Sequence, residues 1–215
     1  MDSMQLTEDI SELLGFHAGD GSLYKTAHGL VWELRGGNDE KEFYDKYIIS
    51  LLKKITHINF KAHHRSGGKN GCYGLRSCKK EFIKIFLNFG FNIGNKTKTV
   101  TIPDLVMAGS KTMKSAFLRG LIATDGTAYL AKINNADKNN YPIIEFCSTS
   151  EKLRNQTNEI LHEFGLNSYI WTYKSKKGYS DAFYLRLSGK NKCVKFKERI
   201  GLVNFKHESR LQDGK

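Results

Sequence analysis

Apolar and polar positions along the chain form two successive rounds of helix and strand patterns. Apolar residues three and four positions apart are typical of a helix with one buried face, and strict alternation is typical of a strand. The first round predicts a helix ending at Asp20, strands 22–26 and 29–35, a helix at 39–55, strands 58–65 and 72–77 joined by a Gly-rich turn at 66–71, and a helix at 79–91. The second predicts a helix at 112–125, strands 126–133 and 142–148, a helix at 150–165, strands 168–174 and 182–188, and a helix at 191–201.

Each round therefore reads α-β-β-α-β-β-α, which indicates an internal repeat in an α+β protein. The first helix of each round ends in Asp-Gly, and Asp20 and Asp125 lie 105 residues apart. We expect two pseudosymmetric halves, residues 1–95 and 111–215, joined by a linker at 96–110. The full length of 215 residues is enough for one large domain or two small ones.

Each predicted strand has one apolar face and one face that is basic, polar and aromatic. In the strand 29–35, for example, Leu30, Trp32 and Leu34 alternate with Val31, Glu33 and Arg35. The apolar faces are expected to pack under the helices. The other faces and their neighbours supply the candidates for contacts with nucleic acid, which are Ser22, Tyr24, Lys25, Arg35, Lys61, His63, Arg65, Arg76, Thr127, Tyr129, Lys132, Glu145, Tyr169, Trp171, Tyr173, Tyr184, Arg186 and Ser188.

The charge of the chain strengthens this interpretation. The formal net charge is +12 and the isoelectric point is about 9.5, values typical of proteins that bind nucleic acid. Residues 57–80 contain no acid, and Asp181 is the only acid between Trp171 and Lys197. Solvated surface is the alternative reading of such basic segments, but their recurrence in both halves, interleaved with aromatic residues, favours phosphate binding.

The two helices that end in Asp-Gly carry small residues at matching positions, namely Gly15, Ala18 and Gly19 in one and Gly120, Ala123 and Thr124 in the other. This spacing forms a stripe on each helix. Because glycine inside a helix costs roughly 0.5–1 kcal/mol relative to alanine, we expect the stripes to pack on each other, with Gly15, Gly19, Gly120 and Thr124 at the interface. Parallel helices would then bring Asp20 and Asp125 together at two negative dipole ends, an arrangement that divalent cations stabilise. The alternative is that each Asp-Gly only ends its helix in a tight turn.

The stretches "LLGFHAGDG" at 13–21 and "LRGLIATDG" at 118–126 resemble the motifs of the LAGLIDADG homing endonucleases. The two-repeat pattern extends this resemblance over essentially the whole chain. Single-chain members of that family have two pseudosymmetric halves, with the motif helices at their interface and two saddle-shaped antiparallel sheets in the DNA major groove. The first motif departs from the family letters at His17 and Ala18, while both acids are kept.

The resemblance implies a function and a set of site residues. Asp20 and Asp125 would be the catalytic acids and would bind Mg²⁺, with Mn²⁺ or Ca²⁺ as possible substitutes, assisted by the carbonyl groups of Gly19 and Thr124. The protein would be an intron-encoded monomer that cleaves both strands of a long asymmetric site in double-stranded DNA by metal-dependent phosphodiester hydrolysis.

One departure from the family favours a different function. Many members carry a lysine near the end of the second strand of each half, where this chain has Arg35 and Ser148. Lys25 and Lys132 are nearby basic candidates that cannot be assigned to the role. The alternative is a non-cleaving nucleic-acid binder of the same fold, such as an intron RNA maturase or a regulatory relative.

Several other classes are disfavoured. No apolar run is long enough for a membrane span, the acidic N-terminus lacks the apolar core of a secretion signal, and the four scattered cysteines suit reduced thiols inside a cell. We therefore expect an intracellular protein, in the cytoplasm of a prokaryote or in an organelle. The spacing of His57, His63, His64, Cys72 and Cys78 matches no zinc motif. An intein is disfavoured because the chain begins Met-Asp and ends "QDGK".

Overall fold

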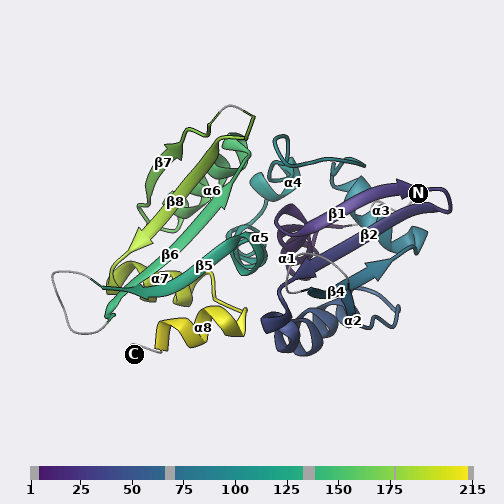
Figure 1. Cartoon of the computed structure of the whole chain (residues 1–215), viewed down its shortest axis with the longest axis horizontal. Coiled ribbons are helices and arrows are strands. Elements are labelled where there is room, and N and C mark those ends of the chain that lie inside the picture. The colour runs from purple at the N-terminus through teal and green to yellow at the C-terminus, as the bar shows by residue number, and fades with distance from the viewer. Residues whose placement is uncertain (1–4, 66–70, 133–138, 177, 213–215) are drawn as a thin grey trace.

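The computed structural model describes residues 5–65, 71–132, 139–176 and 178–212. Two helices, α1 (Glu8–Ala18) and α5 (Lys111–Asp125), lie at the centre of the molecule, with one four-stranded sheet on either side (Figure 1). The chain thus forms two similar halves that meet along these helices. The bounds 1–95, 96–110 and 111–215 stay a prediction.

The first half contains one sheet and the helices that cover it. After α1 come β1 (Gly21–Thr26), β2 (Gly29–Gly36), a 3₁₀ turn η1 (Asn38–Glu40), a π-helical turn η2 (Phe43–Ile48), α2 (Ile49–Ile55), β3 (His63–Arg65), β4 (Cys72–Ser77) and α3 (Lys80–Asn88). A short helix α4 (Asp104–Met107) lies in the segment that leads to α5.

The second half repeats this order. After α5 come β5 (Gly126–Ala131), β6 (Tyr141–Ser148), α6 (Glu151–Glu163), β7 (Tyr169–Tyr173), β8 (Ala182–Ser188), α7 (Lys190–Arg199) and α8 (Phe205–Gln212). Ser110 and Ser150 cap α5 and α6, each accepting a hydrogen bond from a backbone N–H three residues later.

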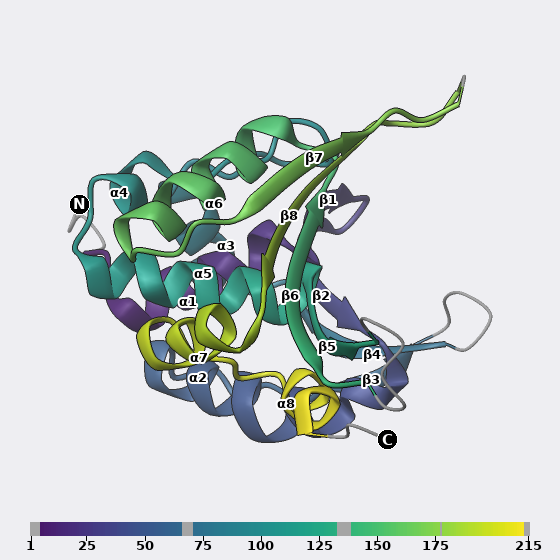
Figure 2. The same cartoon turned by 90° about the vertical axis from the view of Figure 1, so that its left-hand side faces the viewer.

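The two sheets have the same topology. Their strand orders are β1-β2-β4-β3 and β5-β6-β8-β7, and all neighbouring strands run antiparallel. Both sheets curve in the same direction, with the helices packed against their convex side (Figure 2). The predicted α+β class, its repeat and its antiparallel sheets are confirmed.

The core forms as the apolar strand faces predict. Trp32 and Leu34 are buried on the helix side of β2, and Trp32 stacks on Phe86 of α3 with ring centroids 5.4 Å apart. In the second half Leu185 and Leu187 of β8 are buried in the same way. Among the described residues, no helix has the length and apolar character needed to cross a membrane.

Two predicted elements differ from the structure, and one helix of the second half was not predicted. The helix expected at 39–55 is broken into η1, η2 and α2, because Phe43 and Ile48 are both buried and a π turn brings residues five apart onto one face. The strand expected at 58–65 is limited to β3, since Phe60 packs on Phe82 instead of joining the sheet. Helix α8 is not predicted by the pattern. The expected turn at 66–71 lies outside the described residues except for Gly71.

Candidate active site at the helix interface

Helices α1 and α5 lie so close together that there is no room for a side chain at the glycine positions where they touch. A Cβ atom added to Gly15 would overlap the carbonyl oxygen of Phe117, and one added to Gly120 would overlap the carbonyl oxygen of Glu12. Near the start of both helices, the Ser11 hydroxyl donates to the carbonyl oxygen of Met113 at 2.7 Å. The contacts advance along both helices together, so the helices run parallel.

The C-terminal ends of the helices therefore meet. A Cβ atom on Gly19 would overlap the Thr124 hydroxyl and would lie 3.3 Å from Cγ of Asp125. The structure thus brings together the predicted interface residues Gly15, Gly19, Gly120 and Thr124, and with them the acids Asp20 and Asp125. If each Asp-Gly only ended its helix in a tight turn, neither the parallel packing of the two helices nor glycine at their points of contact would be required.

The environment of the two acids opposes their ionisation. Burial, followed by repulsion from Asp125 and Glu40, raises the pKa of Asp20 from 3.8 to about 7. Burial raises the pKa of Asp125 to about 6, although Lys96 acts in the opposite direction. Both acids also lie at the negative ends of helix dipoles. A cation placed between them would therefore be strongly favoured.

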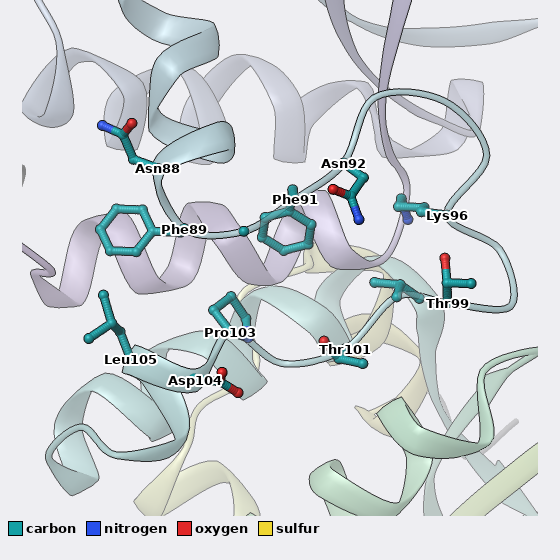
Figure 3. A pocket seen from close by; sticks show the side chains of 12 residues that line it. Asn88, Phe89, Phe91, Asn92, Lys96, Thr99, Thr101, Pro103, Asp104 and Leu105 are labelled. Carbon is teal, nitrogen blue, oxygen red and sulfur yellow. The ribbon is translucent and has the colours of Figure 1, made fainter.

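Lys96 supplies a positive charge at this site that the sequence analysis missed. Its Nζ donates to the carbonyl oxygens of Ala18 at 2.6 Å and Gly19 at 2.5 Å. Figure 3 shows Lys96 on the loop that borders a pocket of about 320 Å³, together with Asn92 and Thr99. Burial lowers the pKa of Lys96, while the charges of Asp125 and Asp20 raise it.

Neither of the two lysine candidates from the sequence can take this place. Lys25 lies five residues beyond Asp20 along an extended strand, which corresponds to roughly 16 Å, and it is on the same face of β1 as the buried Leu23, opposite to the face of Ser22 and Tyr24. Lys132 follows the end of β5, seven residues beyond Asp125 and so about 23 Å away. At the positions of the family lysines, Arg35 is paired with Glu33, and Ser148 is buried.

The polar face of the first sheet is organised around a buried acid that was not among the predicted site residues. Glu33 forms ion pairs with three predicted DNA-binding residues, Arg35 at 2.5 Å, Arg65 at 3.3 Å and Arg76 at 3.8 Å. Burial raises the pKa of Glu33, but hydrogen bonds from Arg35 and Tyr24 outweigh it and lower the pKa overall. The four basic and acidic side chains form one preorganised network.

The second sheet carries the matching pair and an aromatic cluster. Glu145 lies opposite Arg186 in the strand register, just as Glu33 lies opposite Arg76. The Arg186 guanidinium and the Glu145 carboxylate form an ion pair at 2.5 Å. The Arg186 guanidinium lies over Trp171, 4.9 Å from the ring centroid. Trp171 in turn stacks between Tyr184, at 4.7 Å, and Tyr169, at 5.6 Å. Tyr169 is exposed, and Trp171 and Tyr184 are half-buried; aromatic rings and a guanidinium plane on a sheet face are suited to contact with bases and sugars.

The remaining predicted residues are spread over the same strands. Ser22 and Tyr24 alternate with buried Leu23 on β1, and Thr127 and Tyr129 flank buried Ala128 on β5. His63 lies in β3, Tyr173 ends β7 with 57% exposure, and Ser188 ends β8. Lys61 is exposed but lies before β3, outside the sheet.

The residues at the helix ends fit a divalent metal ion in part. Carboxylate and carbonyl oxygens are the donors that Mg²⁺ prefers, and Mg²⁺ is often held by only one or two carboxylates together with phosphate and water. Within the described ranges no group of three or more His, Cys, Asp or Glu side chains is arranged to hold a metal. An ion bound by Asp20 and Asp125 would thus complete its shell with carbonyl oxygens, water and a phosphate.

Comparison with known proteins identifies the class. Residues 112–201 match the LAGLIDADG-like domain family. The chain superposes on I-DmoI in complex with DNA and Mn with a TM-score of 0.61 and 16% identity, covering 90% of this chain and 96% of that one. It superposes on I-WcaI bound to its DNA recognition sequence with a TM-score of 0.60 and 15% identity, covering 97% and 88%. At these identities the structural matches show a shared fold.

Curated relatives are similar over most of this chain but are much longer. The replication factor C small subunit of Methanocaldococcus jannaschii is 30% identical over 198 residues, which cover 88% of this chain and 11% of that protein. The tRNA-splicing ligase RtcB of Methanopyrus kandleri is 25% identical over 203 residues, covering 89% and 20%. The chain therefore spans about a tenth to a fifth of these relatives.

Two repeated halves, parallel glycine-striped helices and an acid at the end of each are the features that the resemblance to two-motif LAGLIDADG proteins predicts. The predicted resemblance to the LAGLIDADG homing endonuclease family is confirmed, since the second half matches the family domain and the chain as a whole has the homing endonuclease fold.

Proposed function

We propose that this chain is a site-specific endonuclease that cleaves double-stranded DNA by metal-dependent phosphodiester hydrolysis. The observation that carries the proposal is the pair Asp20 and Asp125, which glycine-mediated helix packing holds together at the junction of the two sheets. Keeping two buried carboxylates at two negative helix ends is costly for a purely structural element, and a catalytic cation offsets that cost.

The chain's own residues would divide the work as follows. Asp20 and Asp125, with the carbonyl groups of Gly19 and Thr124, would hold Mg²⁺ and orient the scissile phosphates. A bound divalent ion lowers the pKa of water and stabilises the leaving oxygen. Gly15 and Gly120 would fix the distance between the acids, because any side chain at either position would push the helices apart.

The curved sheets would provide the DNA contacts. Their concave side carries no helix (Figure 2), and the networks around Glu33 and Glu145 fix arginines on their polar faces. Holding an arginine in place before binding reduces the entropy lost when it contacts a base or a phosphate. Two sheets of matching topology would read two half-sites of one long target, and their different side chains would make that target asymmetric.

The curated relatives support an origin in a mobile element. A replication factor subunit and a tRNA-splicing ligase are different kinds of protein, yet both match about 200 residues of this chain within a small part of their own length. An endonuclease module inserted into unrelated host proteins, as in an intein, accounts for that pattern. This comparison reinstates the intein origin that the chain ends had disfavoured.

A selection and cleavage experiment tests the proposal. The protein is used to select bound duplexes from a random DNA library in Ca²⁺, and the enriched site is cloned into a supercoiled plasmid. We expect linear product with Mg²⁺ or Mn²⁺ and none with EDTA. Binding to the enriched site without any metal-dependent cleavage would contradict the proposal.

A non-cleaving nucleic-acid binder is the second candidate, and a specific observation favours it. Arg35 is engaged with Glu33, and Ser148 is buried, so neither position offers the free cation that many family members place there. Tight binding in the same selection, with intact plasmid at all metal concentrations, is the outcome that this candidate predicts.

A further inference from the structure

In each half, the segment that follows α3 or α7 places a polar side chain at the C-terminal end of the central helix, α1 or α5. In the first half, Lys96 follows α3 and donates to the carbonyl oxygens of Ala18 and Gly19. In the second half, Asn204 follows α7, and its Nδ2 donates to the carbonyl oxygen of Ala123 at 2.8 Å. Ala18 and Ala123 occupy equivalent positions, 105 residues apart, so the two contacts are pseudosymmetric.

The two contacts differ in charge. Lys96 brings an ammonium group with three donors, whereas Asn204 brings a neutral amide. The same amide nitrogen also donates to Oε1 of Glu40 at 2.7 Å, so it bridges the two halves. A cation at a helix C-terminus is favoured by the dipole. The end of α1 thus carries a bound positive charge, and the end of α5 is held by a neutral group.

The loop that carries Lys96 is anchored by its backbone. Gly94 donates its N–H to the carbonyl oxygen of Leu23 at 2.7 Å, and Val100 donates to the carbonyl oxygen of Lys96 at 2.8 Å. Figure 3 shows this loop alongside the lining residues of the pocket. Bonds on both sides of Lys96 hold its backbone, so the ammonium group is directed to the helix end by a fixed loop.

The Gly19 carbonyl is also a group that the proposed function assigns to a metal ion. We propose, on the basis of that proposed function, that Lys96 is a resident cation of the Asp20–Asp125 site. Its ammonium group fills the cation position that uses the Gly19 carbonyl, while the position that uses the Thr124 carbonyl is left to a divalent ion. The two metal positions are then unequal in the DNA-free protein, although the halves share one fold.

Metal titration of the DNA-free protein tests this inference. Titration calorimetry with Mn²⁺ is compared for the wild type, Lys96→Met and Lys206→Met. Lys206 is the matched control, because its charge also acts on Asp20 while its Nζ pairs with Asp39 at 2.8 Å and does not contact the helix end. We expect one ion per chain in the wild type and in Lys206→Met, and two in Lys96→Met.

Two results would overturn the inference. One is an unchanged ion count in Lys96→Met, and the other is an equal gain in Lys206→Met, which would mean that nearby charge alone controls binding. If Lys96→Met does not fold by circular dichroism, Lys96→Gln retains hydrogen-bonding capacity without the charge and should show the same gain.

The titration separates this inference from the proposed function, because it requires no DNA and no cleavage. Ion counts as expected, together with an uncut plasmid, would contradict the endonuclease and support the resident cation. Plasmid cleavage together with equal ion counts in the wild type and Lys96→Met would support the endonuclease and contradict the resident cation. Absence of Mn²⁺ binding in all three proteins would overturn the inference alone, because a catalytic ion can still bind together with the DNA phosphate.

Discussion

Asp20 and Asp125 lie where burial and the dipoles of both helices act against a negative charge. The raised pKa values of about 7 and about 6 express that cost. An acid whose pKa is higher in the folded chain than in the unfolded chain binds more protons when folded. In the metal-free protein the two ionised acids therefore destabilise the folded state. This electrostatic defect should be measurable in the free energy of unfolding.

The defect gives the metal-free protein a specific pH dependence. Between about pH 4 and pH 7 the folded state holds protons on the two acids that the unfolded state has released, so their contribution to stability falls as pH rises. Asp125→Asn removes one of the charges. We expect the variant to be more stable than the wild type at pH 8 in EDTA, by on the order of 2 kcal/mol, with the difference disappearing near pH 4. Urea unfolding at each pH measures it.

Comparison with the wild type isolates this contribution. Burial lowers the pKa of His17 to about 3 and of His207 to about 4, which gives the opposite pH slope, but both are present in either protein and cancel in the difference. Glu159→Gln, on the exposed face of α6, is the control and should show no such trend. A difference between Asp125→Asn and the wild type that is independent of pH would contradict the assigned burial.

The acids could be predicted from the sequence because each ends a local pattern of small residues. Lys96 and Glu33 could not be predicted in the same way. Lys96 reaches the site from a segment 76 residues beyond Asp20, and nothing in its neighbours indicates where the loop returns. Glu33 was correctly assigned to a polar strand face, but its partners Arg65 and Arg76 are set by the register of β3 and β4, which spacing does not fix.

At the scale of elements, the contact of α1 with α5 determines the geometry of the site. The Gly15 and Gly120 positions each face a carbonyl oxygen of the opposite helix. Helix propensity and packing therefore act in opposite directions at these glycines. Propensity alone favours alanine by roughly 0.5–1 kcal/mol, whereas an added Cβ has no space.

Gly120→Ala tests that opposition. We expect the variant to be destabilised by about 1–3 kcal/mol, because the Cβ atom would force the helices apart. The reference is Asn155→Ala at an exposed position of α6, which gains helix propensity without a backbone neighbour and should be neutral or slightly stabilising. Thermal or urea unfolding of both variants measures the effect. Stabilisation by Gly120→Ala would show that the helices do not pack as described.

Elements with a strong local pattern were predicted well, and those fixed by tertiary contacts were not. The alternating strands β2 and β8 and the helix α5 lie where their patterns indicate. The turn η2 departs from an α-helix to bury Phe43 and Ile48 together. Helix α8 has no apolar run of its own, and it is held by contacts such as Lys206 with Asp39 in the first half.

At the scale of the whole molecule, the charge of the chain and the curvature of the sheets point to a long anionic ligand. DNA affinity should fall steeply with salt, with a slope of log K against log salt of about −0.9 for each phosphate neutralised. Fluorescence anisotropy at several salt concentrations gives the slope. Arg186→Gln should weaken binding to the selected site, and Lys195→Gln on the exposed side of α7 should not. Affinity that does not depend on salt would contradict the proposed DNA surface.

The whole candidate site is built within one chain, since α1 and α5 come from the two halves of the same sequence. We therefore expect a monomer. Sedimentation equilibrium at micromolar concentration should give a mass near 24.5 kDa. A stable dimer under these conditions would mean that a single chain does not complete the assembly that binds DNA.

The cleavage of a supercoiled plasmid carrying the selected site, by wild type, Asp20→Asn, Asp125→Asn and the double variant, tests the central claim most directly. Asparagine ends a helix at least as well as aspartate, so only the carboxylate charge is lost. We predict that the double variant binds the site with nearly unchanged affinity and makes no linear product in Mg²⁺, and that each single variant at most nicks one strand. Full cleavage by the double variant would contradict the assignment of Asp20 and Asp125 as the metal-binding acids.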